Sequence, residues 1–241
     1  MNPGLQKLHA YPFEKLRNLR ESVSVDSTHP IIDLSIGEPK TKLPEVVKEA
    51  LLQSIDQISV YPSTKGTEGL RTSISKWISE RFSIPQELFR PSEHVLPVNG
   101  TREALFGITQ ALFERSPNRM YIAMPNPFYQ IYEGAAFLAG AKPYYLTCEK
   151  ELNFIPDWES ITPSVWKQVS LIYICSPSNP SGAVFGTKDY DRLLKIADTH
   201  NFVVVCDECY SEIYRDDASP PLGLLEWCVQ VGRTNFEKCL V

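Results

Sequence analysis

Residues 169–182 read VSLIYICSPSNPSG, and residues 202–210 read FVVVCDECY. In each stretch a run of β-branched, aromatic and other apolar residues is followed by polar residues, which is the pattern of a buried strand and the loop after it. The segment between them, residues 187–200, is predicted to be a helix. A strand, a helix and a second strand in this order predict a crossover unit with two parallel strands.

The same alternation extends through most of the chain. We predict further strands over residues 31–36, 94–98, 119–124, 143–146 and 237–241, and further helices over residues 13–19, 44–55, 69–82, 101–113 and 129–139. Short apolar strands separated by helices predict an α/β fold with a mainly parallel sheet that helices cover on both faces. Ligands of such sheets bind beyond the carboxyl ends of the strands, where the polar motifs of this chain fall.

The composition of the 241 residues is that of a folded protein, with 43% apolar residues and a net charge of −5. No run of Lys or Arg stands out, which argues against nucleic acid or an anionic membrane as the partner. No secretory signal is visible in the first residues. The longest near-apolar stretch, residues 134–141, is far shorter than the ~20 residues of a membrane helix.

The six cysteines are scattered, and several lie in apolar runs, which predicts buried thiols in a reducing, cytoplasmic compartment. Cys206 and Cys209 have the spacing of a redox or zinc pair, but no second ligand pair of suitable spacing accompanies them. We therefore expect no metal site, and we interpret Cys206 as the end of a core strand.

Two polar motifs have the chemistry to hold opposite charges. Asn99-Gly100-Thr101-Arg102 lies where a helix begins, and the free N–H groups of a first helical turn can bind a phosphate. Most helix starts of this kind bind nothing, so the motif alone is weak evidence. Asp207 ends an apolar strand, where a carboxylate is costly unless it is paired. A protonated pyridine nitrogen could pair with this carboxylate. The alternative is that Asp207 only caps a loop or a helix.

Three further side chains could contact an aromatic ring at the same edge of the sheet. Asn179 lies in a proline-flanked turn, and Tyr210 follows Asp207 by three residues, so an amide and a phenol could bond one ring hydroxyl. Tyr129 could stack on the ring, although ordinary core packing is the simpler explanation of a single tyrosine.

Taken together and in this order, the motifs resemble the fold-type I, pyridoxal-phosphate-dependent aminotransferases of class I and II. Asn179-Pro180-x-Gly182 and Asp207-x-x-Tyr210 are the most specific parts of the resemblance, which runs along the whole chain. It implies an N-terminal arm and first short strand over residues 1–36 and the cofactor-binding large domain over residues 37–241. It also implies pyridoxal 5′-phosphate as cofactor, an amino acid and a keto acid as substrates, and a homodimer.

The resemblance also implies roles for individual residues. Gly100, Thr101 and Arg102 would line the cofactor phosphate, Tyr129 would stack on the pyridine ring, and Asp207 would bond the ring nitrogen.

The remaining roles concern the ring oxygen, the substrate and the dimer. Asn179 and Tyr210 would bond the 3′-oxygen of the cofactor, and Asn179 would also lie against the substrate. Gly37 matches a loop that meets the substrate carboxylate. Tyr61 matches a tyrosine that reaches across the dimer to the phosphate of the other subunit.

The chain departs from the family near its last residue. Family members hold the cofactor through a lysine in a Ser-x-Ser-Lys-type motif, roughly 35–40 residues after the aspartate on the next strand. Counted from Asp207, that position falls just past Val241, and no such motif occurs in the sequence. Lys238 is the last lysine and precedes the final apolar residues, so we expect it at the start of that strand, away from the site.

Other family features are also missing. The arginine that holds the substrate carboxylate and most of the small C-terminal domain do not occur in these residues. We therefore expect a truncated form of the fold that has no catalytic lysine and is inactive by itself. Apolar faces and strand edges left uncovered are expected to lower its solubility and stability.

Two stretches resemble the bacterial succinyldiaminopimelate aminotransferases in particular, namely YPFEKL at residues 11–16 and PNPFYQIYEG at residues 125–134. This resemblance implies glutamate as amino partner and a place in lysine biosynthesis. Two alternatives stay open: a C–S lyase with the same cofactor contacts, and a non-catalytic module that pairs with a longer subunit. A nicotinamide-binding fold is disfavoured because no Gly-x-Gly-x-x-Gly follows a strand.

Overall fold

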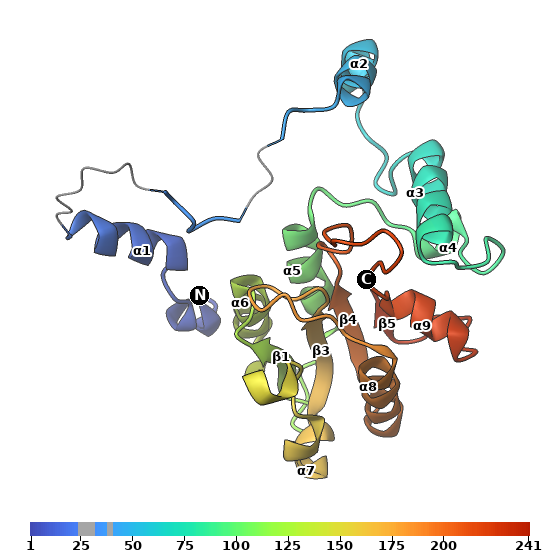
Figure 1. Cartoon of the computed structure of the whole chain (residues 1–241). Coiled ribbons are helices and arrows are strands. Elements are labelled where there is room, and N and C mark those ends of the chain that lie inside the picture. Colours follow the sequence, from blue (N-terminus) through green and yellow to red (C-terminus); the bar gives the residue numbers. More distant parts are fainter. Residues whose placement is uncertain (24–31, 38–40) are drawn as a thin grey trace. The chain divides into compact units, whose positions relative to one another are not determined.

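The computed structural model describes residues 1–23, 32–37 and 41–241, which fall into two compact units. One unit comprises Met1–Lys7 and Lys65–Val241, and the other comprises Leu8–Thr64. Figure 1 labels the α-helices and most of the strands of both units. The predicted boundary between residues 36 and 37 falls within the smaller unit and stays a prediction.

The larger unit is built on a sheet of five parallel strands (Figure 1). In pairing order the strands are β2 (Lys142–Thr147), β1 (Tyr121–Asn126), β3 (Val169–Cys175), β4 (Val203–Asp207) and β5 (Cys239–Leu240). Parallel neighbours need crossover connections, which here contain α6 (Gln130–Ala139), α8 (Thr187–His200) and α9 (Leu224–Gln230). The predicted parallel α/β sheet is confirmed, and α9 is an element that the sequence analysis did not predict.

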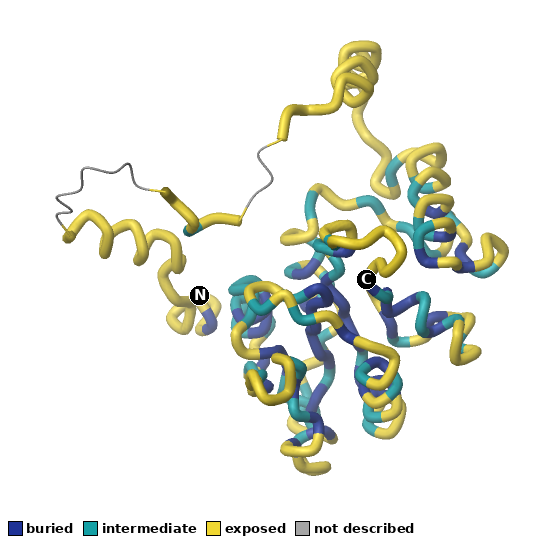
Figure 2. The backbone as a smooth tube through the Cα atoms, viewed as in Figure 1, coloured by how far each residue is buried: buried dark blue, intermediate teal, exposed yellow. Residues whose placement is uncertain are grey.

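Each face of the sheet has a core of its own, because alternate strand residues point to opposite faces. On β3, Leu171 and Tyr173 pack in a core with residues of α6 and of α5 (Thr101–Leu112). Ile172 and Ile174 pack in the other core, which contains residues of α8 and α9. Figure 2 shows the buried strands between helices whose outer surfaces are exposed. This two-sided burial explains why the strands read as continuous apolar runs.

The other elements are short or lie outside the sheet. In the larger unit they are η1 (Pro3–Lys7), α3 (Glu68–Arg81), α4 (Pro91–His94), η3 (Lys150–Leu152), η4 (Trp158–Ser160) and α7 (Pro163–Trp166). In the smaller unit they are α1 (Pro12–Glu21), α2 (Glu45–Ser54) and η2 (Ile55–Ser59). Among the described residues, no helix has the length and apolar character needed to cross a bilayer.

The strand predicted over residues 31–36 is wrong for its described part, residues 32–36, and residue 31 lies outside the described residues. Asp33 Oδ1 accepts hydrogen bonds from the backbone N–H and the hydroxyl of Ser35, at 2.9 and 2.6 Å. Such a local turn offers the backbone an alternative to strand pairing. The carboxylate therefore bends the chain where the apolar residues alone indicated a strand.

The strand predicted over residues 94–98 is also wrong. His94 ends α4, and the residues that follow it form no strand. Pro97 has no N–H group for a strand ladder, and the side chains of Leu96 and Val98 are 66% and 52% exposed. Without a neighbouring strand to pair with or a face to bury, β propensity does not produce a strand.

Candidate active site

The predicted site residues of the larger unit gather at the carboxyl ends of β3 and β4 and at the starts of α5 and α6 (Figure 1). Asp207, the last residue of β4, pairs with Cys175, the last residue of β3. The backbone N–H of Ser176 donates a 3.1 Å hydrogen bond to the carbonyl of Asp207. This bond holds the two strand ends together, so the loops that follow them start from fixed positions.

The carboxylate of Asp207 accepts hydrogen bonds on both oxygens. Tyr132 donates from its hydroxyl to Oδ2 at 2.7 Å, and Cys209 donates from its backbone N–H to Oδ1 at 3.3 Å. Asp207 is only 8% exposed, and these two donors offset part of the cost of burying its charge. Each carboxylate oxygen has two lone pairs, so Asp207 can still accept a further donor from a ligand.

The negative charge of Asp207 also affects the ionisable groups around it. Burial, followed by the charge of Asp207, raises the pKa of Tyr132 well above that of an ordinary phenol. The same two causes raise the pKa of Cys175 and of Cys209 to about 12. All three groups stay protonated at neutral pH, and the same field favours a positively charged ligand atom beside Asp207.

A cationic region lies at the start of α5. Gly100 precedes the helix, Thr101 is its first residue, and Thr101 and Arg102 are exposed. The Nε atom of Arg102 donates a 2.8 Å hydrogen bond to the hydroxyl of Tyr129, the residue before α6. The N–H groups of a first helical turn, the helix dipole and the guanidinium of Arg102 favour an anion here.

The loops after β3 and β4 bring Asn179 and Tyr210 together. The Nδ2 atom of Asn179 lies 3.5 Å from the hydroxyl oxygen of Tyr210, at the outer limit of a hydrogen bond. Burial and the neighbouring Cys209 raise the pKa of Tyr210, so its hydroxyl stays a donor at neutral pH. An amide and a phenol that converge in this way can both donate to one ligand oxygen.

Glu208, beside Asp207, caps a helix. Its Oε1 accepts a 2.7 Å hydrogen bond from the backbone N–H of Leu224, the first residue of α9. Burial raises the pKa of Glu208 to about 7, although the bond from Leu224 acts in the opposite direction. The carboxyl group thus ties the loop after β4 to α9 and positions the peptide next to Asp207.

Lys238 lies toward the amino end of the sheet. Cys239 pairs with Val204, and the carbonyl of Lys238 accepts a 2.8 Å hydrogen bond from the backbone N–H of Val204. Asp207 comes three residues later on β4, which corresponds to about 10 Å along a strand. The backbone of Lys238 is therefore placed well before the strand ends that carry the other site residues.

Gly37 and Tyr61 belong to the smaller unit, apart from the residues described above. Both are exposed there, and the side chain of Tyr61 is 93% exposed. Their roles toward the substrate and toward a second subunit stay predictions.

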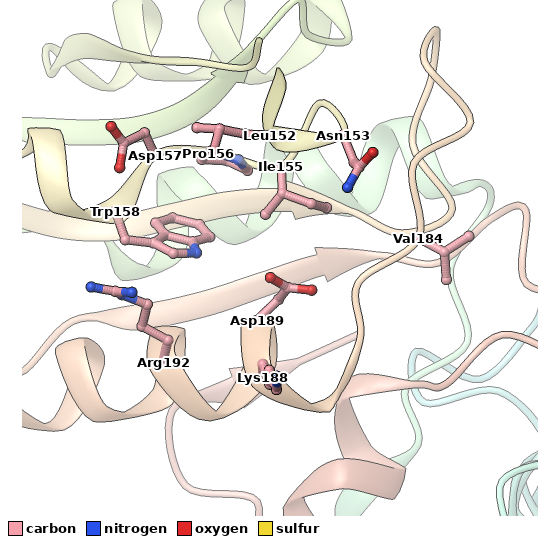
Figure 3. A pocket seen from close by; sticks show the side chains of 10 residues that line it. All are labelled: Leu152, Asn153, Ile155, Pro156, Asp157, Trp158, Val184, Lys188, Asp189 and Arg192. Atoms are coloured by element: carbon pink, nitrogen blue, oxygen red, sulfur yellow. The ribbon is translucent and has the colours of Figure 1, made fainter. Parts of the chain in front are cut away.

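A pocket of about 330 Å³ has a different lining (Figure 3). It is formed by residues 152, 153 and 155–158, by Val184 and by the first turns of α8. Figure 3 shows Asp189 and Arg192 of α8 on one side and the indole of Trp158 facing them. None of the predicted site residues lines this pocket, so the described motifs and this pocket are distinct features of the larger unit.

Tyr132 is a site residue that the sequence analysis missed. Its side chain is 1% exposed, and its ring meets that of Tyr129 edge to face, with centroids 5.9 Å apart. A signal for it was present, because residues three apart on a helix lie on one side. Tyr129 was considered alone, whereas the pair connects Arg102 with Asp207 through a continuous series of contacts.

The fold is that of an α/β protein whose candidate site residues lie at the carboxyl ends of parallel strands and at the starts of α5 and α6. Residues 29–232 match the family of class I and II aminotransferases. The chain belongs to this family, whose members use pyridoxal phosphate as cofactor.

Individual relatives agree with this assignment. An aminotransferase from Neisseria meningitidis Z2491 is 38% identical, with a TM-score of 0.91 over 99% of this chain and 60% of its own. Aminotransferase AspB from Helicobacter pylori 26695 is 34% identical, with a TM-score of 0.85 over 96% of this chain and 59% of its own. LL-diaminopimelate aminotransferase 2 of Trichormus variabilis is 27% identical over 90% of this chain. The chain spans 55% of the length of that relative.

Proposed function

We propose that this chain binds pyridoxal phosphate and forms the cofactor-binding part of an aminotransferase that moves an amino group between an amino acid and a keto acid. The observation that carries the proposal is the series of contacts from Arg102 through Tyr129 and Tyr132 to Asp207. These contacts join a cationic side chain at the start of α5 to a buried carboxylate at the end of β4, which supports a ligand with a phosphate at one end and a basic ring nitrogen at the other.

The residues present fit the cofactor. The N–H groups at the start of α5 and the guanidinium of Arg102 would hold the phosphate, and Tyr129 would contact the ring. Asp207 would accept a hydrogen bond from the protonated ring nitrogen. Asn179 and Tyr210 would donate hydrogen bonds to the ring oxygen.

Bound pyridoxal phosphate supplies a ring that withdraws electrons from a substrate attached to it. Asp207 would keep the ring nitrogen protonated, which would increase that withdrawal. Arg102 and the start of α5 would hold the phosphate and so help to orient the ring toward Asp207. No residue of this chain is assigned the proton transfer at the substrate, because Lys238 lies toward the amino end of the sheet.

For the substrate, we propose an amino acid of the diaminopimelate type with glutamate as amino partner, in lysine biosynthesis. The support is the pair of sequence stretches at residues 11–16 and 125–134, together with the printed name of the relative from Trichormus variabilis. Succinyldiaminopimelate and LL-diaminopimelate are the two substrates to compare. Cleavage of cystathionine at a higher rate than amino transfer would instead indicate the C–S lyase alternative.

For the assembly, we propose a homodimer in which Tyr61 of each subunit reaches the phosphate bound by the other. For the compartment we propose the cytoplasm, which is supported by six cysteines that are all free thiols. Sedimentation of the chain with and without pyridoxal phosphate tests the dimer. Capture of a longer homologous subunit in place of a second copy would support the non-catalytic partner alternative.

The experiment that tests cofactor binding is a titration of the 241-residue chain with pyridoxal phosphate, followed by absorbance and equilibrium dialysis. Asp207→Asn is the test variant, and Asp191→Asn, a half-buried aspartate paired with Lys195 on α8, is the matched control. We expect Asp207→Asn to raise the dissociation constant about tenfold or more, since bonds to charged groups are worth about 1.5–3 kcal/mol. Equal binding by the chain and both variants would contradict the proposal.

A further inference from the structure

We propose that Tyr132 is a positioning residue that fixes the carboxylate of Asp207 in the orientation that meets the ring nitrogen of pyridoxal phosphate. This inference rests on the proposed function, because it concerns the same cofactor. It adds a residue whose phenol need not touch the cofactor and acts through Asp207.

The first support is the asymmetry of the two bonds to Asp207. The hydroxyl of Tyr132 lies 2.7 Å from Oδ2, whereas the N–H of Cys209 lies 3.3 Å from Oδ1. Tyr132 is thus the closer of the two donors, and a bond from a neutral hydroxyl to a carboxylate is among the stronger kinds. Tyr132 is only 1% exposed, so its phenol is shielded from bulk solvent.

The second support is that the phenol itself is held in place. The ring of Tyr132 lies parallel to that of Tyr173 on β3, with centroids 4.4 Å apart and an interplanar angle of 8°. The hydroxyl of Tyr173 donates a 2.5 Å bond to the carbonyl of Leu105 and shares a second bond with the hydroxyl of Thr109, both on α5. The helix that begins at the proposed phosphate site therefore also supports the ring that orients Asp207.

The chemical consequence concerns the proton between Asp207 and the ring nitrogen. Tyr132 and the backbone N–H of Cys209 hold the two carboxylate oxygens in one orientation. With Tyr132 in place, the carboxylate would stay turned toward the ring nitrogen and would favour its protonated form. Without the phenol, Asp207 would lose its closer donor and be free to rotate, so its contact with the nitrogen would weaken and the cofactor would be held less tightly.

The test uses Tyr132→Phe, which removes one oxygen and keeps the ring. Tyr190→Phe is the matched control, because Tyr190 is equally buried but belongs to the core on the other face of the sheet. We expect Tyr132→Phe to raise the dissociation constant of pyridoxal phosphate about tenfold. We also expect the resonance of cofactor labelled with ¹⁵N in the ring to move toward the unprotonated position. The control should match the unchanged chain within about twofold in affinity and keep its ¹⁵N position.

The outcomes separate this inference from the proposed function. If Asp207→Asn weakens binding but Tyr132→Phe changes neither the affinity nor the ¹⁵N resonance, the role of Tyr132 is wrong and cofactor binding stands. If the chain and Asp207→Asn bind equally, both proposals fail. In the Asp207→Asn background, Tyr132→Phe should have no further effect, and an additive effect would show that Tyr132 does not act through Asp207.

A second measurement applies if Tyr132→Phe does not fold, as judged by its thermal melt. Site-specific 3-fluorotyrosine at position 132 keeps both ring and hydroxyl. Its ¹⁹F resonance should move when Asp207→Asn removes the charged acceptor. A resonance that stays in place would overturn the inference.

Discussion

The Nε atom of Arg102 and the hydroxyl oxygen of Tyr129 lie 2.8 Å apart, so the first turn of α5 is joined to the residue before α6. This contact connects α5 with the crossover that contains α6, at the point where the proposed phosphate and ring positions meet. Arg102 can thereby act both as a cation for the phosphate and as a brace for the aromatic side chain.

Replacing Arg102 with Ala should weaken pyridoxal phosphate binding about tenfold or more, because a charge-assisted bond to the phosphate is lost. Arg192→Ala is the control, since Arg192 lines the separate pocket of Figure 3. Fluorescence titration measures both affinities. A larger loss in Arg192→Ala than in Arg102→Ala would place the phosphate elsewhere.

Borohydride reduction in the presence of pyridoxal phosphate should not attach the cofactor selectively to Lys238. The backbone of Lys238 pairs near Val204, about 10 Å before the level of Asp207 along the strand. Peptide mass spectrometry after reduction measures the labelling of each lysine, with the exposed Lys195 as a reference for non-specific reaction. Strong labelling of Lys238 above Lys195 would show that this lysine replaces the one in the family motif.

Glu208 should make stability depend on pH. The ordinary pKa of 4.5 applies in the unfolded chain and a value of about 7 in the folded one, so unfolding releases a proton between these pH values. The stabilising effect of the protonated form is therefore complete below pH 4.5 and is lost as the pH rises to about 7.

Glu208→Gln keeps the acceptor for Leu224 and removes the titration. Relative to this variant, the melting temperature of the unchanged chain should fall between pH 5 and pH 8. The control Glu149→Gln, at an exposed position, should show the same pH dependence as the unchanged chain. Parallel curves for the unchanged chain and Glu208→Gln would show that the burial of Glu208 does not shift its pKa.

Two leucines on helices test where the core lies. Leu193 on α8 is fully buried, and Leu70 on α3 is 49% exposed. Leu193→Ala should lower the free energy of unfolding by about 2–5 kcal/mol, and Leu70→Ala by about 0.5 kcal/mol or less. Urea denaturation measures both, and equal losses would contradict the two-sided core around β3.

The sheet was predictable because its strands are buried on both faces, so each appears as a short apolar run such as residues 169–175. Apolar residues also predicted strands at residues 32–36 and 94–98, where none forms. At the first segment Ser35 bonds locally to Asp33, and at the second no strand among the described residues lies near Pro97 to pair with. A run of apolar residues predicts that a segment is buried, but it does not predict whether another strand lies beside it to pair with.

The candidate site was predictable where a motif is contiguous, as at Asn179 and Asp207. Tyr132 could not be found in this way, because its significance comes from a contact with a residue 75 positions later. A helix spacing of three residues from Tyr129 was the available signal, and it gave the side of α6 without giving the acceptor. Long-range pairing is therefore what the structure adds to the sequence.

The measurement that tests the account most directly is a crystal structure of the 241-residue chain with pyridoxal phosphate bound. The account predicts the phosphate at the N–H groups of Thr101 and Arg102, the ring against Tyr129, and the ring nitrogen within hydrogen-bond distance of Asp207. A cofactor bound elsewhere, for example in the pocket beside Trp158 and Arg192, or turned with its ring nitrogen away from Asp207, would contradict it.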